Sequence, residues 1–222
     1  MSKSIGGAEK LLNLVFPEKC ISCGEYISDE NRPGDFLLAH FFCRECADTI
    51  TRPDRELENV ASPLMYDGAV KNAMQRLKFS SDISSAPFFA AELEREVRAK
   101  FYGMEFDILT CVPATRASLA ERGYNQSRLI AEQMRLGCER DCELLRKSRD
   151  TQVQHLLDAE HRQKNIESAY SMNRGRSVVG KRILLVDDIL TTGATCKACA
   201  RVLLFSGAKS VHIACATLTP RK

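Results

Sequence analysis

A continuous apolar segment followed by two acidic residues is the feature that most constrains this 222-residue chain. Residues 183–186, Ile-Leu-Leu-Val, contain no alternating polar residue, as is typical of a parallel strand covered on both faces. Asp187 and Asp188 end this segment, and burying either as an unpaired charge would cost on the order of several kcal/mol. We therefore expect both carboxylates to face a binding site at the carboxyl end of a buried strand.

The residues after the acid pair favour an anion-binding site. They are small, and three of them carry hydroxyl groups: Thr191, Thr192, Gly193, Ala194 and Thr195. A strand-to-helix turn here can direct backbone N–H groups and hydroxyls at a phosphate. Because carboxylates accept hydrogen bonds from neighbouring hydroxyls, a ligand that reaches both features carries a diol and a phosphate, as ribose 5-phosphate does. A buried strand with a threonine N-cap would explain the threonines but not the two aspartates.

Four of the ten cysteines are spaced as metal ligands. They form two Cys-x-x-Cys pairs, a pattern typical of zinc knuckles that close one tetrahedral structural site: Cys20, Cys23, Cys43 and Cys46. Gly24 suits the tight turn after the first pair, and residues 31–34 predict a turn between two short strands. We therefore expect a zinc-ribbon-like module that depends on Zn²⁺ for folding. His40 lies near the second pair, but four thiolates already complete the shell.

The domain organisation follows from a polar linker over residues 51–60. We place a zinc-binding N-terminal module at residues 1–55 and a larger domain at residues 56–222. Helical periodicity and short apolar runs alternate in the larger domain, which predicts an α/β fold, a parallel sheet flanked by helices, with its ligand at the carboxyl ends of the strands. In the whole chain the expected helices cover residues 9–16, 67–78, 88–101, 127–136 and 195–206, and the expected strands cover residues 63–66, 106–113, 144–146, 183–186 and 210–218.

A family resemblance narrows the fold and the ligand. The segment ILLVDDILTTGAT resembles the motif with which type I phosphoribosyltransferases bind 5-phosphoribosyl-1-pyrophosphate (PRPP). With the cysteine pairs, nearly the whole chain resembles the ComF/GntX group of phosphoribosyltransferase-like proteins through three further segments: PLMYDGAVKNAMQRLKF, VPATRASLAERGYNQS and LLRKSRDTQVQHLLDAEHRQKNIESAY. The resemblance implies the type I phosphoribosyltransferase fold, with the zinc module in place of the usual nucleobase-covering hood. It also implies PRPP bound with Mg²⁺, the acid pair on the ribose hydroxyls and the glycine turn on the 5′-phosphate.

The same resemblance implies roles for residues outside the acid motif. Arg116 is the available cation in the segment that corresponds to the pyrophosphate loop. The residues Arg122, Asn125 and Gln126 match the group's Arg-Gly-aromatic-Asn-Gln signature and are expected to face PRPP. Asn125 is also suited to cap a helix, and the two roles are compatible.

A basic, polar segment over residues 146–152 lacks apolar periodicity. In phosphoribosyltransferases a loop in this part of the chain closes over PRPP and excludes water, so Arg149 joins Asp187 and Asp188 as a candidate catalytic residue. The residues expected to assist it are Thr151, Gln152, Arg162 and Asn165. A solvated basic loop is the alternative interpretation.

Some residues keep two interpretations. Lys78 either stabilises the negative, C-terminal end of a helix dipole or contacts the ligand. The remaining cysteines near the expected helices are better explained as small packing residues than as redox or metal groups: Cys138, Cys142, Cys196 and Cys199.

Composition leaves two functions open. The net charge of +3 is nearly balanced and is not typical of a nucleic-acid-binding surface. Neither a membrane-spanning run nor a secretory segment is present, so we expect a cytoplasmic protein without membrane insertion. The chain either transfers a phosphoribosyl group to an acceptor that the sequence does not name, or serves as a non-catalytic PRPP- or nucleotide-binding accessory protein of DNA uptake, natural competence or recombination. The second function implies single-stranded DNA or a competence-machinery protein as partner, and a homodimer stays open.

Overall fold

The sheet of the larger domain is parallel throughout, as expected from the sequence. The computed structural model describes residues 18–54, 56–80, 82–147 and 169–220. Its main sheet has the strand order β1-β8-β7-β3-β4, with β2 also paired to β8, and all these pairings are parallel. The strands are β1 (Val60–Ala61), β2 (Leu64–Met65), β3 (Ile108–Cys111), β4 (Glu139–Arg140), β7 (Arg182–Leu190) and β8 (Ser210–Leu218).

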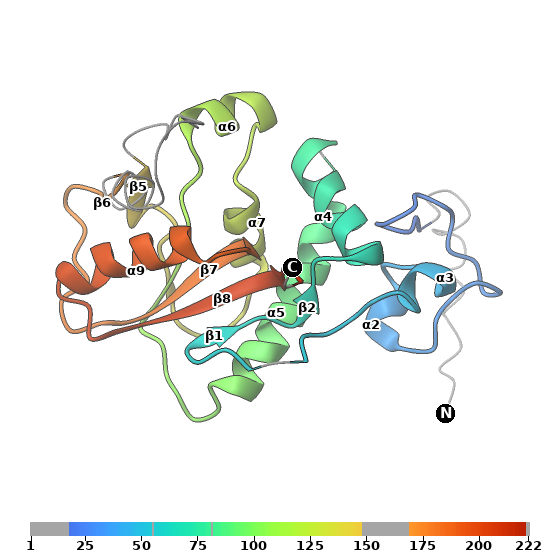
Figure 1. Ribbon diagram of the computed structural model, residues 1–222, viewed down its shortest axis with the longest axis horizontal. Helices are drawn as coiled ribbons and strands as arrows, with labels where there is room; N and C mark the ends of the chain where they lie inside the picture. The colour runs from blue at the N-terminus through green and yellow to red at the C-terminus, as the bar shows by residue number, and fades with distance from the viewer. Residues whose placement is uncertain (1–17, 55, 81, 148–168, 221–222) are drawn as a thin grey trace.

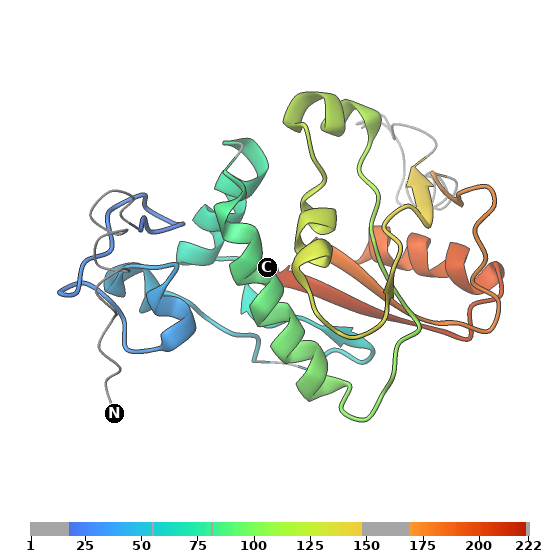
Figure 2. The same ribbon diagram turned by 180° about the vertical axis from the view of Figure 1, so that it is seen from behind.

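Strand β7 lies in the middle of the sheet, and helices cover both of its faces (Figure 1). Ile183 and Leu185 belong to one buried cluster, which includes residues of α9 (Ala194–Phe205), whereas Leu184 and Val186 belong to the other. This second cluster is formed with α4 (Gly68–Phe79), α5 (Ala86–Lys100) and α7 (Gln126–Gln133), and α5 crosses in front of the sheet in Figure 2. The two clusters explain why residues 183–186 of the strand are all apolar.

A small antiparallel hairpin lies outside the main sheet. It joins β5 (Leu145–Lys147) to β6 (Tyr170–Met172), and Leu145 and Tyr170 are buried in the same cluster as α9. The expected strand over residues 144–146 is therefore confirmed, but it pairs in a separate sheet.

Helix α6 (Arg116–Arg122) was not expected from the sequence. The Oγ1 atom of Thr115 accepts a hydrogen bond from the backbone N–H of Ser118 and caps its first turn, and Gly123 ends it with a left-handed φ of 80°. The segment that was predicted to be a loop between β3 and α7 is therefore a short helix with both of its capping signals present.

The N-terminal module contains short helices where two strands were expected. They are α2 (Phe36–Ala39) and α3 (Arg44–Ala47), and Asp35 caps the first by accepting from the backbone N–H of Leu38. The two-strand interpretation of this segment is wrong, because the residues after the predicted turn carry an N-cap and fold as a helix. The only β pairing in the described part of the module is the bridge between Lys19 and Tyr26.

The module packs directly on the larger domain. The ring centroids of Phe42 and Phe88 lie 4.9 Å apart, and both side chains are fully buried. Thr51 Oγ1 donates to Asp67 Oδ1 at 2.7 Å, just before the first residue of α4. One continuous apolar core thus spans the predicted boundary near residue 55, and the division at that residue stays a prediction.

Two predictions concern other parts of the chain. The expected helix over residues 9–16 lies outside the described residues. Among the residues that are described, no helix is both long and apolar enough to cross a membrane.

Candidate functional site

The two adjacent aspartates lie on a strand that continues past them. Strand β7 continues through both of them to Leu190, so side chains alternate across it. Asp187 follows the residues that face α9, and Asp188 follows those that face α4, α5 and α7. The acid pair therefore does not end the strand, as the sequence suggested; at the carboxyl end of β7, Asp187 contacts α7 and α9, and Asp188 contacts α4.

Asp187 is buried and accepts three hydrogen bonds. Ser127 Oγ donates to Oδ1 at 2.9 Å, the backbone N–H of Asp188 donates to the same oxygen at 3.0 Å, and Cys196 Sγ donates to Oδ2 at 3.3 Å. Burial and the neighbouring Asp188 charge raise the pKa of Asp187 to about 7. Its carboxyl group thus titrates near neutral pH in the ligand-free protein.

Asp188 forms an ion pair across the site with Lys78. The Nζ atom of Lys78 lies 2.8 Å from Oδ2 of Asp188, and each side chain is mostly buried. Lys78 is the next-to-last residue of α4, so its charge also lies at the negative end of the helix dipole. Lys78 therefore lies at the helix end and also contacts the acid pair, so the lysine belongs to the site.

The glycine turn connects β7 to α9 directly after the acid pair. Gly193 has a φ of 74° and occupies the N-cap position of α9, a conformation that favours glycine because other residues are strained there. Thr192 Oγ1 accepts from the backbone N–H of Ala194 at 3.4 Å, and Thr191 and Thr192 are exposed. The first backbone N–H groups of an α-helix have no intrahelical acceptor, so those that follow Ala194 in the first turn of α9 are available to an anion.

A cleft of about 880 Å³ lies between α6, α7 and the β5–β6 hairpin. Arg116 and Asn125 line it, as do Arg128, Arg146 and Lys147. Asn125 caps α7 and its Nδ2 donates to the backbone oxygen of Val112 at 2.8 Å, so the predicted capping role is present. The residues that line this cleft do not include the acid pair or the glycine turn.

The other residues of the signature segment are placed differently. Gln126 is buried, and its Nε2 atom has no hydrogen-bond partner among the described residues. The guanidinium of Arg122 lies over the ring of Phe79, 5.2 Å from its centroid, and not against the acid pair. Ser127, which contacts Asp187, was not singled out from the sequence, although a hydroxyl next to the matched signature was the available signal.

The candidate catalytic residue of the basic segment 146–152 lies outside the described residues. Arg149 belongs to this segment, together with its expected assistants Thr151, Gln152, Arg162 and Asn165. Its catalytic role stays a prediction.

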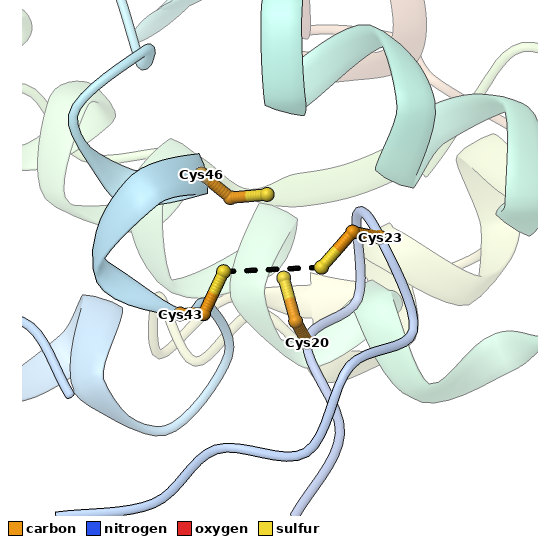
Figure 3. Close-up of side chains that lie close together, drawn as sticks. All are labelled: Cys20, Cys23, Cys43 and Cys46. Carbon is orange, nitrogen blue, oxygen red and sulfur yellow. Dashed lines mark hydrogen bonds between the residues drawn. The ribbon is translucent and has the colours of Figure 1, made fainter. Parts of the chain in front are cut away.

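The four N-terminal cysteines converge, as expected. Their sulfur atoms all lie within 4.8 Å of one another, and Cys23 Sγ lies 3.8 Å from Cys43 Sγ (Figure 3). Zinc–sulfur bonds of about 2.3 Å in a tetrahedron separate the sulfurs by about 3.8 Å, so the cluster fits such an ion. The backbone N–H of Gly24 donates to the oxygen of Cys20 at 2.8 Å and forms the first knuckle. This cluster can hold a metal ion, and His40 is not part of it.

The fold and the site together define a class of protein. A parallel sheet that carries an acid pair and a glycine turn at the carboxyl end of its middle strand is a phosphoribosyltransferase-type domain. The family model "Phosphoribosyl transferase domain" matches residues 118–222.

Comparison with known proteins narrows this class. The chain is 31% identical over 182 residues to the DNA utilization protein YhgH of Escherichia coli (strain K12). This match covers 80% of this chain and 78% of that one. It is 29% identical over 185 residues to the competence protein ComFC of Bacillus subtilis (strain 168), and this match covers 81% of this chain and 72% of that one. A solved glutamine PRPP amidotransferase of B. subtilis aligns over 68% of this chain and 28% of its own, with 21% identity and a TM-score of 0.39. The chain belongs to the ComF family of phosphoribosyltransferase-like proteins.

Proposed function

We propose that this protein binds PRPP with Mg²⁺ at the carboxyl end of β7. The observation that carries the proposal is the placement of two carboxylates and a glycine turn on one continuous segment, within reach of a single sugar phosphate. The carboxylates of Asp187 and Asp188 accept from the ribose hydroxyls, and the N-terminus of α9 takes the 5′-phosphate with Thr191, Thr192 and Thr195.

The ion pair between Lys78 and Asp188 sets the charge of this site. Lys78 Nζ contacts Oδ2 of Asp188, and an ionised carboxylate offers about four acceptor positions, so Asp188 can accept from a ribose hydroxyl while the ion pair persists. Lys78 thus offsets part of the negative charge that the acid pair places beside an anionic ligand.

Mg²⁺ suits this chemistry because it prefers oxygen ligands and keeps few protein contacts. Its fit here rests on the donor set, which consists of carboxylate oxygens next to the oxygens that pyrophosphate and ribose themselves provide. When bound, it neutralises charge on the leaving pyrophosphate.

For the N-terminal cluster we propose Zn²⁺ as the resident metal. Four thiolates leave no open coordination position, so the ion has a structural role. Phe42, next to Cys43, packs on Phe88 of α5, and the metal therefore holds a part of the main core in place.

Transfer of the phosphoribosyl group to an acceptor is the activity that this site supports best. The alternative is an accessory protein of DNA uptake that binds PRPP or a nucleotide without turnover, and the names of the relatives favour a role of this kind. Arg116 is exposed, and it is the one cation among the described residues between β3 and Leu119, so this segment by itself offers little charge to a leaving pyrophosphate.

Isothermal titration of the zinc-loaded protein with PRPP in the presence of Mg²⁺ tests the binding proposal. We expect saturable binding that weakens when Mg²⁺ is removed. Release of pyrophosphate in the presence of candidate acceptors then separates transfer from binding alone. Absence of PRPP binding in both conditions contradicts the proposed function.

A further inference from the structure

The last turn of α4 carries a second feature besides Lys78. Phe79, its final residue, is 67% exposed in the described part of the chain. The guanidinium of Arg122 covers the ring at 5.2 Å from the centroid. An aromatic ring with a cation on one side and this much exposed surface leaves its other face open to a planar group.

The position of this ring is fixed from two sides. Tyr124 Oη donates to the backbone oxygen of Leu77 at 2.6 Å, which ties the end of α4 to the segment between α6 and α7. Arg122 ends α6, and its Nε atom is buried without a hydrogen-bond partner among the described residues. Figure 1 shows the free ends of α4 and α6 rising on the same side of the sheet. The ring and the guanidinium are therefore held by two elements rather than by a free loop.

The ring also adjoins the proposed sugar site. Lys78 precedes Phe79 in the chain and reaches Asp188 with its ammonium group. In a nucleotide the base is attached to the ribose carbon next to the 2′-hydroxyl, the kind of group that the acid pair accepts from. A base on a sugar bound there lies within reach of the last turn of α4.

We propose that Phe79 and Arg122 form a stacking site for a nucleobase. This inference rests on the proposed function and names the chemical class of the group that lies beside the ribose. The base belongs either to a free nucleotide or to a single strand of DNA, and the two sources share the stacking chemistry. Because deoxyribose lacks the 2′-hydroxyl, a DNA strand would rely on stacking and phosphate contacts without that contact to the acid pair.

Equilibrium binding of four probes tests this inference. The probes are ribose 5-phosphate, a nucleoside 5′-monophosphate, a short thymidine oligonucleotide and an abasic oligonucleotide of the same length. In the parent protein we expect the probes with bases to bind at least fivefold more tightly than their counterparts without bases, because a stacked base adds affinity that the sugar phosphate lacks.

Phe79→Leu should remove this advantage and leave the affinities for ribose 5-phosphate and the abasic strand unchanged. Phe205→Leu is the matched control, because Phe205 is 91% exposed at the far end of α9, and it should change none of the four affinities. Loss of the advantage for the monophosphate alone identifies a free nucleotide, and loss for the oligonucleotide identifies a strand.

Two failures are distinguishable. If ribose 5-phosphate does not bind the parent protein, the proposed sugar site is wrong. If Phe79→Leu leaves the affinities for both base-containing probes unchanged, or if neither binds, the stacking site is wrong whatever the ribose 5-phosphate result.

Discussion

The ammonium group of Lys78 lies 2.8 Å from the carboxylate of Asp188, and this contact links the end of α4 to the middle strand of the sheet. Lys78 also places a positive charge near two adjacent carboxylates. The first prediction concerns what remains when this charge is removed.

Lys78→Met should lower the free energy of unfolding by about 1–2 kcal/mol at pH 8, because the charge of Asp188 then lies uncompensated beside Asp187. This figure lies between the typical cost of breaking an exposed ion pair and that of breaking a buried one. The double variant Lys78→Met/Asp188→Asn should recover most of this loss. Urea unfolding of the four proteins in a double-mutant cycle measures the coupling. Coupling near zero would show that the ion pair contributes nothing to the fold.

The second prediction concerns the pH dependence of stability. The pKa of Asp187 is raised to about 7 by burial and by the Asp188 charge, above the value of a free carboxyl. The folded state therefore binds this proton more tightly than the unfolded state does, and its stabilisation is fully present below about pH 4 and is lost as the pH rises through about 7. Asp187→Asn removes this loss and should be more stable than the parent by on the order of 4 kcal/mol at pH 8.

At pH 4 the parent and the Asp187→Asn variant should differ little, since the carboxyl group is protonated in the folded protein. The amide that replaces the carboxyl group keeps an oxygen acceptor for Ser127 and for the backbone N–H of Asp188, while the thiol of Cys196 loses its acceptor. Unfolding curves at pH 4, 6 and 8 measure the difference. A variant that is less stable at pH 8 would show that the charged carboxylate supports the sheet rather than a ligand.

The third prediction separates ligand binding from stability. Asp187→Asn and Asp188→Asn should each weaken PRPP binding at least tenfold, because each loses a charge-assisted acceptor worth about 1.5–3 kcal/mol. Titration calorimetry measures this loss on the same samples whose stability is known. Unchanged PRPP affinity in both variants contradicts the assignment of the acid pair to the ribose.

Thr192→Val probes the other half of the site. The change deletes a hydroxyl of the glycine turn while keeping the shape of the side chain, so binding of both ribose 5-phosphate and PRPP should weaken by a similar factor. Free ribose carries no phosphate and its affinity should stay the same. Equal loss for all three ligands would mean that the turn supports the acid pair instead of binding a phosphate.

The fifth prediction concerns the metal. Freshly purified, reduced protein should contain one zinc ion per chain by elemental analysis, and Cys43→Ser should lose it. Cys138→Ser is a control outside the cluster and should retain the ion. Because Phe42 packs on Phe88, the loss should also lower the melting temperature of the main core, and a core that melts unchanged would show two independent units.

The sequence predicted the parallel sheet, the four-cysteine cluster and the acid pair, because each depends on a local pattern. Continuous apolar residues over 183–186 predict a strand covered on both faces, and both covering layers are present. The different contacts of the two aspartates could also have been expected, since the side chains of consecutive strand residues start from opposite faces. They were missed because the strand was taken to end before the pair.

Other features depend on contacts between distant segments. The partner of Lys78 lies 110 residues further along the chain, and no periodicity in α4 specifies it. Helix α6 was missed although Thr115 and Gly123 mark its two ends, because a loop was expected from the position of the segment. Ser127 contacts Asp187 only because α7 begins above the carboxyl end of β7.

Helix α4 has a consequence for how the two ends of the molecule communicate. Near its first residues the backbone N–H of Ala69 donates to Thr49 Oγ1 of the cysteine module at 3.2 Å, and its last turn places Lys78 on Asp188. A rigid helix fixed at both ends transmits a shift at one end to the other. Any preference of the sugar site for the metal-loaded form must then be matched by tighter metal binding when the sugar site is filled, because the coupling between two binding equilibria is reciprocal. The affinity for the ion, measured in competition with a chelator at equilibrium, thereby becomes a gauge of occupancy at the far end of the helix.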